Sequence, residues 1–140
     1  PSDGWAISWG AGEVFHYNGF SWALVYDFTY GEIHSVWATN NSNLWVAGNE
    51  ICPPGKGRND VWHWNGSTWA SYNATIIYDV EGTSGTDVWF AGHYGQIYHW
   101  NGIEFSKMNS TTTEDIMKIY FIDSSDGWAV GDGGVILRYH

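Results

Sequence analysis

The chain has little cysteine, little proline and few positive charges. Of its 140 residues one is cysteine, Cys52, which excludes a disulfide within the chain. Five lysines and arginines stand against 15 aspartates and glutamates, giving a net charge of −10. An acidic chain is a poor ligand for nucleic acids, because neutralising phosphates requires a basic surface, and anionic membranes are disfavoured for the same reason.

Long apolar runs and helical patterns are also missing. No segment approaches the roughly 18 consecutive apolar residues of a membrane-spanning helix, so we expect no membrane insertion. No segment shows a convincing helical period either, and we expect almost no helix. The chain is instead 44% hydrophobic, with 11 tryptophans among its aromatic residues. This composition and length predict a packed domain over residues 1–140.

One phrase occurs four times along the chain. It reads DGWAIS from Asp3, NLWVAG from Asn43, DVWFAG from Asp87 and DGWAVG from Asp126. Its tryptophans are 40, 44 and 39 residues apart. A period near 40 built from short strands is typical of a β-propeller. The repeated tryptophans, which we expect to pack between repeats, are Trp5, Trp45, Trp89 and Trp128.

A second phrase follows each copy: VFHYNG, VWHWNG, IYHWNG and finally ILRYH at residues 136–140. Asn-Gly between alternating segments predicts a hairpin with a type I′ turn, because glycine and asparagine tolerate positive φ. Strand-like runs at 33–39, 76–84 and 116–123 precede the next tryptophan phrase. With the strands of a repeat labelled A to D, the chain reads B-C-D, A-B-C-D, A-B-C-D, A-B-C. We therefore expect an all-β fold of four-stranded antiparallel propeller blades, with 14 strands in about 3.5 blades.

These motifs resemble those of known propellers. The segment SSDGWAVGDGGVILRYH, residues 124–140, is similar to repeats of Ycf48-like, BNR-like and WD40-like propellers. The resemblance covers the chain except an insertion at 49–59, and it implies that strand A is innermost and strand D outermost. The acidic position of the sialidase Asp-box is taken here by Tyr17 or Trp64, so the resemblance does not imply sialidase chemistry.

Three and a half blades leave the repeat incomplete at both ends. The first unit lacks an A strand and the last lacks a D strand. The chain is then a piece of a longer propeller, or a poorly closed four-bladed monomer, or one of several copies that complete each other head to tail. Unpaired edges and exposed apolar faces favour association, and we predict that the chain is not a stable isolated monomer.

Antiparallel strands place the B–C and D–A connections on one face of the propeller, the loop face. The C–D links are uniform Asn-Gly turns, whereas the B–C and D–A loops vary, including the insertion at 49–60. Function concentrates on variable loops held by a rigid scaffold. The candidate ligand-binding residues are Trp9, Tyr30, His93, Tyr94 and Asp132, although ordinary turns also use such residues.

The sequence contains no metal-binding, cofactor-binding or catalytic motif that we recognise. His16, His63 and His99 share one place in strand C, where the fourth copy has Arg138. Equivalent residues lie one blade apart and cannot converge on one ion, so we expect these groups to form hydrogen bonds between blades. We therefore predict no cofactor, no metal and no enzyme activity.

Four sequons and the acidic, lysine-poor composition favour an exported protein, outside the cell or on its surface. The candidate glycosylation sites are Asn40, Asn65, Asn73 and Asn109. Cys52, in the insertion, is an incidental loop thiol or else an intermolecular attachment point.

The predicted function is a non-enzymatic interaction and assembly module. It would associate with itself and bind a partner protein through the loop face. A lectin-like propeller that binds glycans is the alternative, and a carbohydrate-active enzyme is a third class. The resemblance to Ycf48-like propellers implies protein binding or assembly, by analogy of fold alone.

Overall fold

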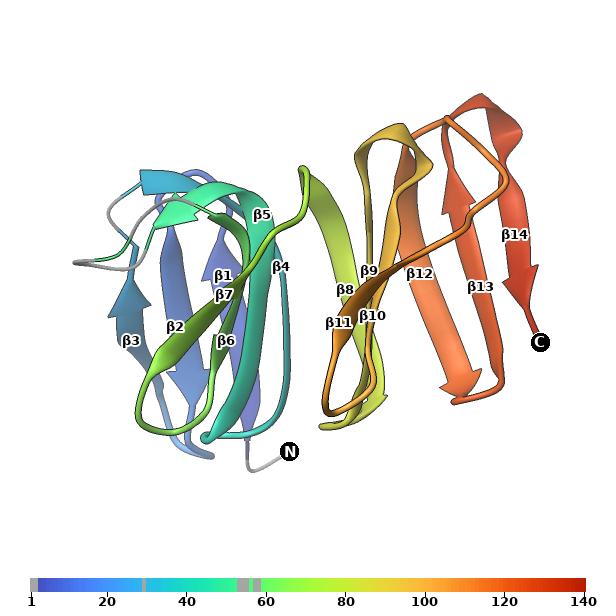
Figure 1. Ribbon diagram of the computed structural model, residues 1–140. Coiled ribbons are helices and arrows are strands. Elements are labelled where there is room, and N and C mark those ends of the chain that lie inside the picture. Colours follow the sequence, from blue (N-terminus) through green and yellow to red (C-terminus); the bar gives the residue numbers. More distant parts are fainter. Residues whose placement is uncertain (1–2, 29, 53–55, 57–58) are drawn as a thin grey trace.

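The computed structural model describes residues 3–28, 30–52, 56 and 59–140. Within them the chain forms fourteen strands in four antiparallel sheets, which stand side by side in a row (Figure 1). We number the sheets as blades 1 to 4. Blade 1 contains β1 (Gly4–Ser8), β2 (Glu13–Tyr17) and β3 (Trp22–Asp27). Blade 2 contains β4 (Tyr30–Asn40), β5 (Asn43–Cys52), β6 (Asn59–Trp64) and β7 (Trp69–Tyr72).

The second half of the chain repeats this arrangement. Blade 3 contains β8 (Ile77–Ser84), β9 (Asp87–Gly92), β10 (Ile97–Trp100) and β11 (Phe105–Met108). Blade 4 contains β12 (Ile116–Asp123), β13 (Asp126–Gly131) and β14 (Ile136–Tyr139). Two 3₁₀ turns, η1 (His93–Gly95) and η2 (Asp132–Gly134), lie in B–C loops. Neither turn, and no other helix in the described residues, has the length and hydropathy to cross a membrane.

The predicted strand order is confirmed. Within each blade the strands pair in sequence order, and the A strands β4, β8 and β12 pack against one another along the row. Blade 1 has no A strand, and there β1 packs against β4. The A–B and C–D turns lie at one end of the strands and the B–C and D–A loops at the other, as expected (Figure 1).

The Asn-Gly hairpins are confirmed, but the predicted type I′ turn is wrong. Positive φ is found at Gly19, Gly66 and Gly102, at 91 to 94°, and not at the preceding asparagines. Instead the asparagine side chain accepts hydrogen bonds from the turn. In the first hairpin the Asn18 Oδ1 atom accepts from the backbone N–H groups of Phe20 and Ser21, at 3.0 and 3.1 Å. Asparagine is used here for its side-chain carbonyl rather than for its backbone freedom.

The insertion is only partly a loop. Strand β5 continues through Cys52 and β6 begins at Asn59, with Ile51 paired to Asn59, so residues 49–52 and 59–60 extend the B–C hairpin. Residues 53–55 and 57–58 of the predicted loop lie outside the described residues. Cys52 is buried at the strand end and its thiol donates to the carbonyl of Lys56, at 2.7 Å. This burial favours a structural role for the thiol.

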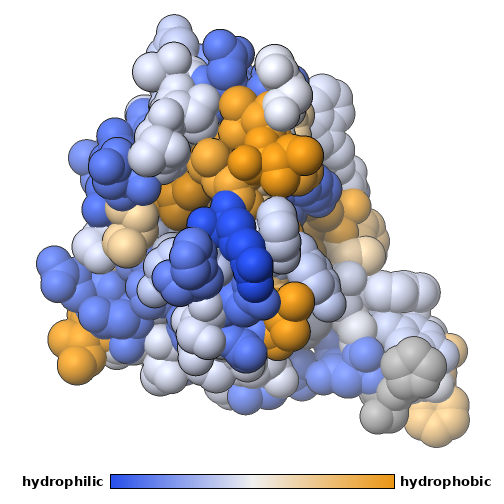
Figure 2. All heavy atoms as spheres, turned by 90° about the vertical axis from the view of Figure 1, so that its right-hand side faces the viewer, coloured by the Kyte–Doolittle hydropathy of each residue, from blue (hydrophilic) through white to orange (hydrophobic). Residues whose placement is uncertain are grey.

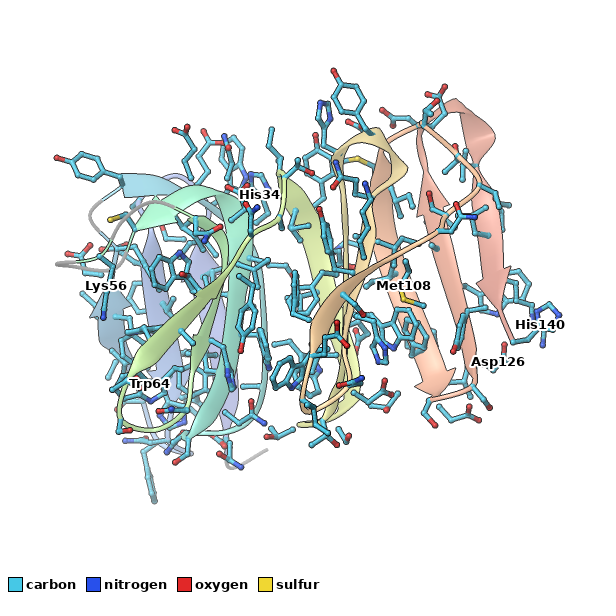
Figure 3. All side chains as sticks on the ribbon, viewed as in Figure 1. His34, Lys56, Trp64, Met108, Asp126 and His140 are labelled. Atoms are coloured by element: carbon cyan, nitrogen blue, oxygen red, sulfur yellow. The ribbon has the colours of Figure 1, made fainter. Side chains whose placement is uncertain are left out.

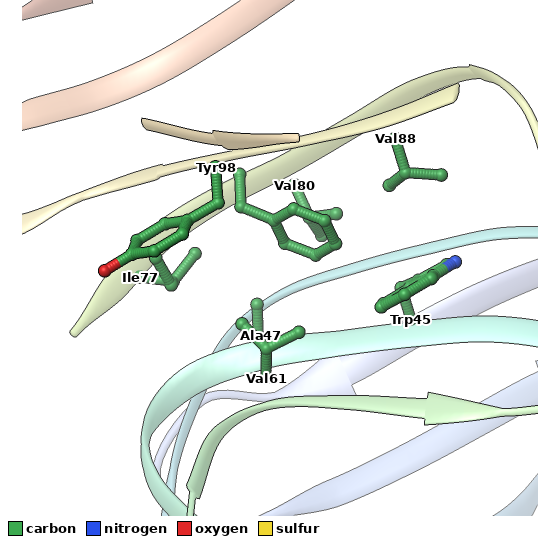
Figure 4. Close-up of a cluster of buried hydrophobic side chains, with 8 residues drawn as sticks. Trp45, Ala47, Val61, Ile77, Val80, Val88 and Tyr98 are labelled. Carbon is green, nitrogen blue, oxygen red and sulfur yellow. The ribbon is translucent and has the colours of Figure 1, made fainter. Parts of the chain in front are cut away.

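The core is divided among the contacts between blades. Between blades 2 and 3, Trp45 packs against Phe90 with ring centroids 5.1 Å apart, and neighbouring apolar side chains of both blades close around them (Figure 4). Trp45 and Trp89 are 0% and 3% exposed, as expected of repeat residues that pack between blades. Trp128 differs, with 40% exposed, because no further blade covers it.

The row of blades is open. Blade 1 and blade 4 lie at opposite ends of it, and the structure does not close into a four-bladed ring (Figure 1). Both end sheets have three strands, as the incomplete repeats predict. Within the described residues, no further sheet covers the outer faces of these two sheets.

Candidate functional site

A row of aromatic rings crosses the loop face. Trp9, in the β1–β2 turn, stacks on His34 of β4 with ring centroids 6.3 Å apart. His34 stacks on Tyr78 of β8 at 5.6 Å, and Tyr78 meets His93 edge-on at 6.5 Å. The rings come from three different blades, and His34 is seen at the loop end of the sheets in Figure 3. We call Trp9, His34, Tyr78, His93 and Tyr94 the ring row.

Asp115, in the loop before β12, holds the far end of the ring row. Its carboxylate accepts hydrogen bonds from the Tyr94 backbone N–H at 2.8 Å and from the Tyr78 hydroxyl at 3.1 Å. The His93 Nδ1 atom lies 2.9 and 3.0 Å from its two oxygens. The Tyr94 N–H, more than any other group, lowers the pKa of Asp115 below its usual value. The pKa of Tyr78 is raised, first by burial and then by its bond to Asp115.

Bulges in the A strands aim the ring row at the loop face. The pairing of A with B shifts between Ile33 and Ser35 in blade 2, and between Ile77 and Asp79 in blade 3. The unpaired residue at each bulge is the ring residue, His34 or Tyr78. A bulge re-aims a side chain at the end of a strand. The His34 ring is held there by a 2.7 Å hydrogen bond from its Nδ1 to the carbonyl of Ile77 in the next blade.

The glycine that ends the tryptophan phrase makes room for the bulge. A Cβ atom on Gly48 would lie 1.9 Å from the carbonyl oxygen of Glu32, and one on Gly92 would lie 2.0 Å from that of Ile76. A Cβ atom on Gly131 would likewise lie 2.0 Å from the carbonyl oxygen of Asp115. The backbone of strand A thus approaches strand B too closely for any side chain at this position.

Three of the five predicted ligand-binding residues meet in the ring row. Trp9 and Tyr94 are 63% and 66% exposed there, beside His93. Asp132 lies next to the row, because its backbone N–H donates to the carbonyl of Asp115 and its charge contributes to the raised pKa of Tyr78. Tyr30 does not join it. It pairs with Cys52 at the insertion end of β4, roughly 13 Å along the strand from His34.

His34, Tyr78 and Asp115 are not among the predicted site residues. The first two lie inside the repeat, in the strand-like runs at 33–39 and 76–84. The clue was the recurring glycine at Gly48, Gly92 and Gly131, which indicates a close approach of strand A. No sequence pattern indicated Asp115, because only the fold brings its loop beside His93.

The strand-C histidines are structural, but their hydrogen bonds lie within a blade and not between blades as expected. His63 Nε2 bonds Asn43 Oδ1 at 2.8 Å and His99 Nε2 bonds Asp87 Oδ1 at 2.7 Å, in each case at the start of strand B. Each ring also stacks on its own blade's tryptophan, with centroids 4.1 and 3.9 Å apart. His16 bonds Asp3 in the same way. In the part of the chain that the structure describes, no three metal-binding side chains gather.

The four candidate glycosylation sites are on the surface. Asn40, Asn65, Asn73 and Asn109 all have exposed side chains. Asn65 lies in a C–D turn, where its Oδ1 accepts from the Thr68 backbone N–H at 2.9 Å. The sites are thus sterically open to a modifying enzyme.

Solved propeller structures are similar to this chain. A structure of YCF48 bound to a D1 peptide matches with a TM-score of 0.72 and 20% identity, over 99% of this chain and 48% of that one. The WD40 propeller domain of Doa1 matches with a TM-score of 0.52 and 13% identity, over 98% of this chain and 61% of that one. No family model matches the sequence, and no curated protein does. The chain spans about half of the YCF48 chain and has the fold of Ycf48 and WD40 propeller repeats.

Proposed function

We propose that this chain is a non-enzymatic propeller module that is exported, associates with further copies of itself and holds a partner protein on its loop face. The exposed outer face of blade 4 carries the proposal. The similar YCF48 structure contains a bound peptide, which supports protein binding by a chain of this fold.

The outer face of blade 4 has the composition of an internal face. Trp128 occupies the position of Trp45 and Trp89, yet it is 40% exposed where they are 0% and 3%. Arg138, in the place of the strand-C histidine, lies 5.2 Å over its ring. Apolar atoms gather on this side of the molecule in Figure 2. The exposed apolar residues of blade 4 include Tyr120, Ile122, Trp128, Val130 and Ile136.

The outer face of blade 1 supplies the complementary half. Trp22 and Leu24 of β3 are 53% and 49% exposed. By register Trp22 corresponds to Phe105, which packs between blades 2 and 3. Blade 4 of one copy can therefore cover blade 1 of the next through a head-to-tail contact, which builds rings or filaments.

Light scattering across a dilution series tests self-association. We expect multimers of the 15.8 kDa chain at micromolar concentration, and monomers for Trp128→Glu. Trp9→Glu is the matched control, because Trp9 is also an exposed tryptophan but lies on the loop face; it should leave the multimer intact. A wild-type chain that stays monodisperse at 15.8 kDa would refute self-association.

The ring row supports a binding role for the loop face. Trp9 and Tyr94 offer exposed ring faces. The Asp115 carboxylate holds Tyr78, His93 and the Tyr94 backbone in place through hydrogen bonds. Planar apolar groups with polar groups beside them suit protein side chains. They also suit the faces of sugar rings, and this observation favours a glycan-binding lectin as the second candidate.

A glycan array separates these two functions. We expect no glycan to bind above background. Glycan binding that is lost in Trp9→Ala and Tyr94→Ala would favour the lectin instead. The carbohydrate-active enzyme has less support. Carboxylates of two blades border the ring row, but each is paired with a histidine of the row: Glu32 lies 3.6 Å from His34 Nε2, and Asp115 lies 2.9 Å from His93 Nδ1.

A further inference from the structure

The ring row has open aromatic faces at both of its ends. Trp9 stacks on His34 with an angle of 23° between the ring planes, and His34 stacks on Tyr78 with an angle of 25°. These rings therefore cover one another's faces in the middle of the row. The end rings, Trp9 and Tyr94, stay largely exposed. The row thus offers one flat apolar surface at each end.

The row is assembled across the three contacts between blades, and not on the outer faces of blades 1 and 4. The stack of Trp9 on His34 joins blades 1 and 2, and the stack of His34 on Tyr78 joins blades 2 and 3. Asp115 of blade 4 bonds His93 of blade 3. The geometry of the row is therefore set by residues that the structure describes.

Carboxylates stand beside the row at one repeated position. Glu32 and Asp115 are equivalent in the repeat, because their carbonyl oxygens make the close approach to Gly48 and Gly131. The Glu32 carboxylate lies 3.6 Å from His34 Nε2, and its side chain is 47% exposed. The Asp115 side chain is 22% exposed. This position therefore brings one negative charge to the Trp9 side of the row and one to the Tyr94 side.

Two further carboxylates add negative charge on the Tyr94 side. Asp132 is exposed, and its backbone N–H donates to the Asp115 carbonyl at 2.9 Å. Glu114 is exposed as well and precedes Asp115 in the chain. The hydrogen bond from the Tyr94 N–H, more than any other group, lowers the pKa of Asp115, so this carboxylate is ionised at neutral pH. Three carboxylates thus gather around one open ring.

The positive charges of the chain do not balance these carboxylates. Lys118 and Arg138 form ion pairs with aspartates of β8 and β13. Lys56 lies at the far left of Figure 3, away from His34. Within the described residues, no lysine or arginine forms an ion pair with a carboxylate beside the row. The row therefore keeps a negative charge that a partner can complement.

We propose that the ring row binds an extended, arginine-containing basic segment of the partner, which rests on the proposed function of the loop face. A guanidinium stacks on aromatic rings and bonds a carboxylate through two parallel N–H groups, so it suits this surface better than an ammonium. Trp9 and Tyr94 supply the rings, and Glu32 and Asp132 the carboxylates. Steps between neighbouring rings are 3.8 to 6.5 Å, so about six extended residues reach from end to end.

The peptide GRGRGR, acetylated and amidated, is the probe. Its control carries citrulline in place of arginine, which keeps the shape of the side chain and removes its charge. Calorimetry with the full chain at low ionic strength should show the arginine peptide binding at least about tenfold more tightly, with the difference shrinking as salt is added. The multimer variant Trp128→Glu should bind equally, because its change is on the outer face of blade 4.

Variants of the chain place the site. Tyr94→Ala and Asp132→Asn should each weaken binding of the arginine peptide about two- to fivefold, as for an exposed cation–π contact or ion pair. Glu104→Gln is the matched control, because it removes an equal charge from an exposed C–D turn at the other end of the strands. It should leave binding unchanged. Equal weakening by Glu104→Gln and Asp132→Asn would overturn the proposal, since net charge alone would then explain binding.

The same titrations separate this proposal from the proposed function. If the citrulline peptide binds as tightly as the arginine peptide and both are weakened in Tyr94→Ala, the loop face binds peptides without regard to charge. That result would overturn the basic preference and leave the proposed function intact. If neither peptide binds at millimolar concentration, the preference and peptide binding by the ring row both fail. Self-association is decided separately by light scattering.

Discussion

Replacing Asp79 with alanine should destabilise the contact between blades 2, 3 and 4. Asp79 is 6% exposed and is held among three blades. Its carboxylate accepts from Ser35 Oγ of β4 at 3.1 Å, from the Ile119 backbone N–H of β12 at 3.0 Å and from Lys118 Nζ at 3.0 Å. One side chain therefore ties the A strands of the row together.

The expected cost is worked out from these partners. Alanine leaves the buried N–H of Ile119 without an acceptor, which costs about 1–3 kcal/mol, and removes the bond from Ser35, worth about 1 kcal/mol. The Lys118 ammonium is on the surface, with its side chain 68% exposed, so its pairing adds less than about 1 kcal/mol. We expect Asp79→Ala to lose about 3 kcal/mol of unfolding free energy. Asp79→Asn keeps an acceptor for Ile119 and should lose about 1 kcal/mol.

Urea unfolding measures both values by linear extrapolation. The two variants change the net charge identically, so the difference between them isolates the hydrogen bond to Ile119. Lys118→Met should lie within about 1 kcal/mol of the wild type. If Asp79→Asn is as unstable as Asp79→Ala, charge rather than hydrogen bonding explains the effect, and the reasoning is wrong.

Three further predictions follow from single positions. Gly92→Ala should cost more than about 2 kcal/mol, since its Cβ would meet the Ile76 carbonyl at 2.0 Å, whereas Gly10→Ala, with nothing within 4 Å, should be nearly neutral by urea unfolding. Burial lowers the pKa of His63, so its NMR titration midpoint should fall below about 6.5. The free energy of unfolding should decline as the pH drops below that value, because the unfolded chain binds the proton first. A titration midpoint at or above 6.5 would contradict this prediction. Secretion from a glycosylating host should add mass that substitution of the four sequon asparagines by glutamine removes, and an unmodified secreted chain would refute their use.

The candidate site was predictable where it departs from the repeat. Trp9, His93 and Tyr94 were identified because they lie in loops that differ between copies. His34 and Tyr78 were overlooked because they occupy a repeated strand position, and only the bulge turns them toward the loop face. Tyr30, which was predicted with them, lies apart from the row, at the insertion end of β4.

The sequence by itself determined the strands, their order and the faces on which the loops lie. The repeat is sufficient to predict them because, within a blade, each strand pairs with its neighbour in the chain. The hairpins that join these strands depend on local turn residues such as Asn18 and Gly19. Tertiary structure alone decided which side chains meet across blades. Asp115 joins His93, and Phe105 enters the Tyr72 and Tyr98 cluster, because these contacts depend on how blades stack and not on residues adjacent in sequence.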